Sequence, residues 1–98
     1  MPQIGTFARD EHGVFYGTIR TVVLTVETVI RPSEKESGKA PDYRVFAGPL
    51  EFGAAWEKTS RKNQVYLSVK LDDPSFAAPI YASLMESEDG GHRLIWSR

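Results

Sequence analysis

Residues 65–71 read Val-Tyr-Leu-Ser-Val-Lys-Leu and contain the most regular apolar alternation in the chain. Every second residue is aliphatic, whereas Tyr66, Ser68 and Lys70 lie between them. A period of two puts alternate side chains on opposite faces of a β-strand, so this run predicts a strand with one buried face. Asp72-Asp73-Pro74-Ser75 follows and ends the strand, because proline lacks the N–H of a ladder and aspartate favours turns.

The same pattern recurs on both sides of this strand. Further strands are expected at residues 43–47, 50–56, 80–85 and 92–97. The boundaries are turn sequences: Gly48-Pro49, the polar run 59–64, and the hairpin turn Glu88-Asp89-Gly90-Gly91. Trp56 continues the apolar face of its strand, which favours a position in the core, and Trp96 follows Leu94 in the same way.

Residues 15–30 are also rich in β-branched and aromatic side chains. The residues that would share one face are Val22, Leu24, Val26, Thr28 and Ile30. Phe15 and Ile19 fall in the opposite phase, with Gly17 between them. A change of phase beside a glycine indicates either one long strand bent at a bulge or two strands joined by a short turn, and the pattern favours neither.

These runs predict an all-β protein without a substantial helix. We expect a single small antiparallel β-barrel, or a strongly curled sheet, of about six to seven strands in one domain covering residues 1–98. Pro32 to Asp42 is the clear loop, with two prolines, one glycine and alternating charge. Since this segment has nothing to bury, we expect a flexible loop at about residues 32–42.

Composition narrows the range of functions. The 98 residues contain no cysteine, which excludes disulfides, thiolate metal sites and a cysteine nucleophile. Twelve basic and thirteen acidic side chains give a net charge of −1, so no global field attracts nucleic acid or membrane. The N-terminus does not have the pattern of a signal peptide, and the apolar run 21–30 is too short to span a bilayer. We therefore expect a cytoplasmic protein without a membrane partner.

Seven ordered strings carry a resemblance along the whole chain. They are Ile4-Gly5-Thr6-Phe7, Gly17-Thr18-Ile19-Arg20-Thr21, Lys39-Ala40-Pro41-Asp42-Tyr43-Arg44-Val45, Gly53-Ala54-Ala55-Trp56 with Lys58-Thr59-Ser60, Leu67-Ser68-Val69-Lys70-Leu71-Asp72-Asp73-Pro74-Ser75-Phe76, Ala78-Pro79-Ile80-Tyr81-Ala82 and Leu94-Ile95-Trp96-Ser97-Arg98. Together they resemble the bacterial family catalogued as domain of unknown function 736.

This resemblance implies a small protein without an established activity or catalytic residues. Such proteins are common in proteobacteria, often near plasmid and integrative-element genes for transfer or replication. That neighbourhood implies DNA handling or interference with host defence, by association and not by chemistry.

The residues that catalysis would need are scarce. A nucleophile usually needs a neighbouring histidine as base, and the two histidines, His12 and His92, are expected in exposed turns. Asp72 and Asp73 would suit a divalent cation, but beside Pro74 they are typical of a strand-ending turn. We therefore expect neither an enzyme nor a metal or other cofactor.

Charge is unevenly distributed along the chain despite its small total. Between Trp56 and Leu71 there are four bases and one acid. The candidate nucleic-acid-binding residues are Lys58, Arg61, Lys62, Tyr66 and Lys70, with Tyr43, Arg44, Tyr81 and Arg93 as further candidates for the same surface. Barrel folds hold single-stranded nucleic acid with basic and aromatic side chains on one sheet face. Single-stranded nucleic acid is therefore the first predicted partner.

The alternative partner is a protein of the same host. Five acids and no base lie between Asp72 and Asp89, and the candidate protein-binding residues are Asp72, Asp73, Glu86, Glu88 and Asp89. An exposed edge strand would also pair with a partner or with a second copy, giving a homo-oligomer. This reading predicts an inhibitor of a host defence system, of the anti-restriction or anti-CRISPR type.

Overall fold

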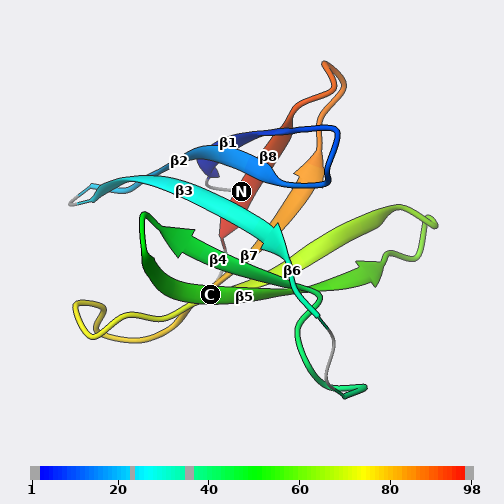
Figure 1. Cartoon of the computed structure of the whole chain (residues 1–98). Coiled ribbons are helices and arrows are strands. Elements are labelled where there is room, and N and C mark those ends of the chain that lie inside the picture. The colour runs from blue at the N-terminus through cyan, green and yellow to red at the C-terminus, as the bar shows by residue number, and fades with distance from the viewer. Residues whose placement is uncertain (1–2, 23, 35–36, 97–98) are drawn as a thin grey trace.

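The chain folds into a closed barrel of eight antiparallel strands (Figure 1). The computed structural model describes residues 3–22, 24–34 and 37–96. The strands are β1 (Gln3–Arg9), β2 (Phe15–Arg20), β3 (Thr25–Pro32), β4 (Tyr43–Ala47), β5 (Leu50–Thr59), β6 (Val65–Leu71), β7 (Ile80–Glu86) and β8 (His92–Trp96). Each strand pairs with the next, and β8 pairs with β1, so the all-β barrel prediction is confirmed. The described residues contain no helix long and apolar enough to cross a membrane.

The barrel has eight strands instead of the expected six to seven because β1 was not recognised. Ile4 and Phe7 are both buried although they are three residues apart, which breaks the period of two. A register shift between Gln3 and Gly5 against β8 causes this. Residues 15–30 form two strands and not one bent strand, and Val22 lies fully exposed in the turn between them.

The core consists of the inward faces of all eight strands. On β6, Leu67, Val69 and Leu71 are each at most 5% exposed, as their alternation predicts. Val69 faces Ala55 of β5 and Ala82 of β7 in the ladder. β6 is therefore a central strand whose inward side chains fill space that its small neighbours leave.

Gly17 shows how tightly this small barrel is packed. It lies opposite Phe7, whose phenyl ring covers the Gly17 backbone. A Cβ added at residue 17 would come within 2.7 Å of that ring and would also meet the carbonyl oxygen of Thr6. Since a backbone oxygen has little room to move, this position requires glycine.

The expectation that Trp56 lies in the core is wrong. The ladder between β4 and β5 shifts register between Val45 and Phe46, where β5 contains an extra residue. Ala55 is consequently buried and Trp56 faces outward, opposite Ser68. Trp96 does face inward, and it packs partly buried against the core.

The expectation that His92 is an exposed turn residue is also wrong. His92 is the first residue of β8 and lies opposite Phe7 and Glu86. Its side chain is only 13% exposed, and its ring packs edge-on against Phe15 with centroids 4.9 Å apart. Pairing with β1 turns this residue toward the barrel interior. His12, in contrast, is exposed in the turn between β1 and β2, as expected.

The loop between β3 and β4 is attached to the barrel wall at several points. The backbone N–H of Asp42 donates to the carbonyl of Ala55, and its carboxylate accepts from the N–H of Glu57 at 2.9 Å. The indole N–H of Trp56 donates to the carbonyl of Lys39 at 3.1 Å. The loop therefore lies against the outer surface of β5. Residues 35–36 of the expected flexible segment lie outside the described residues.

The up-and-down order gives the barrel two different mouths (Figure 1). One mouth is bordered by the β2–β3, β4–β5 and β6–β7 connections, and its inward residues include Ile80 and Trp96. At the other mouth, a cavity of about 140 Å³ is lined by charged and aromatic side chains. They include Arg9, Glu57, Glu86, His92 and Tyr43. The barrel is thus apolar at one end and charged at the other.

Candidate nucleic-acid interface

Three of the five predicted nucleic-acid-binding residues lie on one outward face. Lys58 of β5 faces Tyr66 of β6 directly in the ladder. Lys70 lies on the same side of β6, between Ala54 and Tyr81 on the neighbouring strands. Leu67, Val69 and Leu71, which alternate with Tyr66 and Lys70 along β6, are buried. The alternation that builds the core therefore also directs this basic and aromatic set outward.

A row of cations crosses the barrel wall on this face. In the ladders, Arg31 pairs with Arg44, Arg44 with Ala54, Ala54 with Lys70, and Lys70 with Tyr81. Adjacent strands are separated by about 4.8 Å, so the row follows the wall for roughly 19 Å. Ala54 at its centre has only a methyl side chain and lies between Arg44 and Lys70 in the ladders.

Aromatic side chains lie beside this row. The Arg31 guanidinium sits over the Phe46 ring, 4.3 Å from its centroid. Tyr81 is 57% exposed, and Trp56 lies on the same outer surface of β5. Arg31 and Phe46 belong to this surface, although the sequence pattern did not predict them as site residues. The signal was present, because Arg31 alternates with buried Ile30, but only the ladder brings β3 beside β4.

The cations of this face differ in how far they are already neutralised. Arg44 forms an ion pair with Glu51 at 3.0 Å and also donates to the hydroxyl of Ser33. Within the described part of the chain, Lys58 and Lys70 make no ion pair and remain available to an anionic ligand. We name the outward set Arg31, Arg44, Phe46, Trp56, Lys58, Tyr66, Lys70 and Tyr81 the basic–aromatic face.

Arg61 and Lys62 lie apart from this face, in the exposed turn between β5 and β6. A cavity bordered by Gln64 and Glu86 places this turn beside the acidic β7–β8 hairpin. Of the further candidates, Arg44 and Tyr81 belong to the basic–aromatic face. Tyr43 instead packs inside against Phe15, with ring centroids 5.8 Å apart, and Arg93 lies on β8 opposite Thr6.

The five acidic candidates do not form one patch. Asp72 and Asp73 follow β6 at the apolar mouth, whereas Glu86, Glu88 and Asp89 lie at the opposite end of β7. Hydrogen bonds from the Ser75 hydroxyl and N–H lower the pKa of Asp73. Hydrogen bonds from the Ser87 hydroxyl and the Gly91 N–H lower the pKa of Asp89. These two carboxylates are therefore engaged in stabilising their own turns.

A family model matches residues 3–98 of the chain, and it describes a protein of unknown function, DUF736. The chain belongs to the DUF736 family. No curated protein and no solved structure gives a significant match. Among the described residues of this DUF736 protein, histidine, aspartate and glutamate do not gather in a group of three that would hold a metal ion.

Proposed function

We propose that this DUF736 protein is a non-enzymatic binding protein for single-stranded nucleic acid, acting through the basic–aromatic face. The observation that carries the proposal is the direct pairing of cations with aromatic rings across neighbouring strands. Lys58 lies beside Tyr66, and Lys70 lies beside Tyr81. Such pairs suit a ligand that offers a stackable base and a phosphate in each repeat.

The loop between β3 and β4 adds to this argument. Trp56 holds the carbonyl of Lys39, so the loop borders the face along β5. The loop beside this face would limit the directions in which a bound nucleic acid can lie. The family resemblance is consistent with an accessory role in mobile DNA elements such as plasmids, in the cytoplasm of a bacterium.

The competing role, a protein partner bound through the acids or an edge strand, has less geometric support. The acidic residues are divided between the two barrel ends, and two of them serve local turns. Every described strand pairs on both sides, so adding a partner strand or a second copy would require opening a ladder. Recovery of one host protein in a pull-down, with no oligonucleotide binding, would favour this role.

The test is fluorescence anisotropy with a labelled oligothymidylate about 15 nucleotides long, measured across a salt series. We expect saturable binding that weakens as salt rises, because cations on the protein displace counterions from phosphates. Lys70→Ala should reduce the slope of log affinity against log salt by about 0.7. Tyr81→Ala should cost about 1–3 kcal/mol of binding free energy and leave that slope unchanged.

Arg93→Ala is the matched control, because Arg93 is an exposed cation on β8, outside the basic–aromatic face. Its affinity should equal that of the unmodified protein. Absence of binding at low salt, or binding that salt does not affect, would contradict the proposal. Circular dichroism of each variant separates a lost contact from a lost fold.

A further inference from the structure

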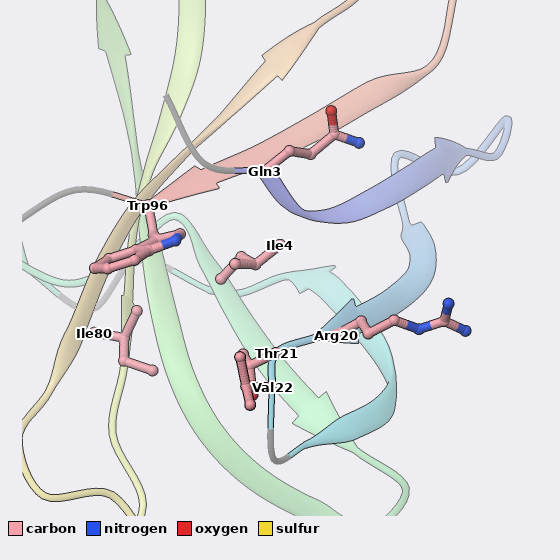
Figure 2. A pocket seen from close by; sticks show the side chains of 7 residues that line it. All are labelled: Gln3, Ile4, Arg20, Thr21, Val22, Ile80 and Trp96. Atoms are coloured by element: carbon pink, nitrogen blue, oxygen red, sulfur yellow. The ribbon is translucent and has the colours of Figure 1, made fainter.

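The apolar mouth of the barrel also contains a cavity, which is separate from the basic–aromatic face. A cavity of about 630 Å³ is lined there by Gln3, Ile4, Arg20, Thr21, Val22, Ile80 and Trp96 (Figure 2). Small-molecule sites commonly have volumes of about 300–1,000 Å³, and barrel mouths are a frequent location for them. The size and place of this cavity therefore fit a small ligand.

The walls of this cavity are largely apolar. Ile80 begins β7 and Trp96 ends the neighbouring β8, and Figure 2 shows the two side chains together on one side of the opening, with Thr21 and Val22 on the other. Ile4 lies at the base of the opening and is 7% exposed, whereas Val22 at the rim is fully exposed. These side chains border open space, so a ligand that removed them from water would gain hydrophobic free energy.

One positive charge borders the apolar space. Arg20 is the charged residue among the seven that line the cavity, and Figure 2 shows its guanidinium directed away from Trp96 and Ile80. Within the described ranges of the chain, Arg20 makes no ion pair. A guanidinium without a carboxylate partner at the rim offers several hydrogen-bond donors to an anion.

An adjoining polar cavity of about 380 Å³ runs along β1 and β2. It shares Gln3, Ile4 and Arg20 with the apolar cavity and adds the threonines Thr6 and Thr18. The two cavities therefore border each other at these three residues. An apolar cavity thus lies beside one that is lined by hydroxyls and a cation.

We propose that the apolar mouth binds a small free amphiphilic anion of the acyl-carboxylate class. The acyl chain lies against Ile80, Trp96 and Val22, and the carboxylate lies in the polar cavity beside Arg20. A ligand with an apolar tail and an anionic head satisfies both compartments.

The first experiment uses Trp96 as the reporter. The chain has two tryptophans, so Trp56→Phe leaves Trp96 alone. This variant is titrated with dodecanoate and dodecylammonium below their micelle concentrations, and with dodecan-1-ol below its solubility limit. We expect dodecanoate to change the Trp96 fluorescence saturably, with one ligand per chain in calorimetry. The alcohol should bind about tenfold more weakly because it loses the charge-assisted contact, and the ammonium more weakly still.

Two substitutions test the two compartments. Arg20→Gln should weaken dodecanoate about tenfold and leave dodecan-1-ol unchanged. Val22→Asp should weaken both ligands, and folding should tolerate it because Val22 is fully exposed. Arg9→Gln is the matched control, since Arg9 is an exposed arginine at the opposite, charged mouth. It should bind all three compounds as the parent does.

Several results would overturn the inference. These are no saturable binding, equal binding of carboxylate and alcohol, or equal effects of Arg20→Gln and Arg9→Gln. Sedimentation as a dimer that Val22→Asp dissociates would show that a second copy covers the mouth. Binding to phosphatidylglycerol vesicles without binding of monomeric dodecanoate would assign the mouth to a lipid surface instead.

Discussion

His92 is a partly buried histidine at the charged mouth of the barrel. Its Nδ1 atom is buried and has no hydrogen-bond partner in the described structure, and its Nε2 lies 4.0 Å from the Glu86 carboxylate. Burial lowers the pKa of His92 below its ordinary 6.5, and Arg9 adds to this, whereas Glu86 opposes it. Neutral imidazole is therefore the form that the folded barrel favours.

This preference predicts how stability depends on pH. Between the lowered pKa and 6.5, the unfolded chain binds more protons than the folded one, so the free energy of unfolding rises with pH there. The His92 contribution is complete above 6.5 and is lost as pH falls through the folded pKa. Urea denaturation across this range should show that loss.

His92→Phe keeps an aromatic ring and removes the titration, so it should flatten the pH dependence in this window. His12→Gln, in the exposed β1–β2 turn, is the control and should leave the profile as it is. The lowered pKa values of Asp10, Asp73 and Asp89 act separately, because their contributions are lost only below 3.8. An unchanged profile in His92→Phe would show that another group controls stability near pH 6.

At the scale of elements, β6 joins the core to the basic–aromatic face. Its inward residues Leu67, Val69 and Leu71 are buried. Its outward residues Tyr66 and Lys70 pair with Lys58 and Tyr81. Substitution of a buried inward residue of β6 should therefore change the free energy of unfolding, whereas substitution of an outward residue should change nucleic-acid binding.

Val69→Ala should lower the free energy of unfolding by about 1–3 kcal/mol, because Val69 is 1% exposed between Ala55 and Ala82. Thermal and urea unfolding measure this loss. The control on the same strand is Val65→Ala, whose side chain is 58% exposed. It should change stability by no more than about 0.5 kcal/mol. Equal losses for both substitutions would contradict a central position for residue 69.

At the scale of the whole molecule, the two proposed sites occupy separate surfaces. The basic–aromatic face covers the outer wall from β3 to β7, whereas the amphiphile site lies at the mouth between β1, β2 and the start of β7. Arg20 lies on β2 and Lys58 lies on β5, and these two strands do not pair with each other in the barrel. Coupling between sites requires an element whose two states both ligands bias.

Saturating dodecanoate should therefore change the oligothymidylate affinity less than about twofold. Anisotropy titrations with and without dodecanoate measure this, and Arg20→Gln, which should bind dodecanoate about tenfold more weakly, is the control in which the same dodecanoate concentration should have a smaller effect. A larger change that disappears in Arg20→Gln would show that the sites are linked. In that case the amphiphile would regulate nucleic-acid binding.

The local sequence pattern was sufficient to predict much of the fold. The period of two at Val65–Leu71 predicts a strand with its buried face, and glycine, proline and aspartate mark the turns that separate the later strands. Lys58, Tyr66 and Lys70 could be assigned to one surface for the same reason. These features depend on neighbouring residues and on the alternation of side chains along a strand.

The all-β class, the buried face of β6 and the outward position of Lys58, Tyr66 and Lys70 follow from the order of the residues along the chain. The tertiary structure alone decided three further features: barrel closure by β1 and β8, the outward position of Trp56, and the inward position of His92. Closure is a pairing between the two ends of the chain. One extra residue at the β4–β5 register shift reverses the faces that follow it, so an alternation read along one strand cannot locate Trp56.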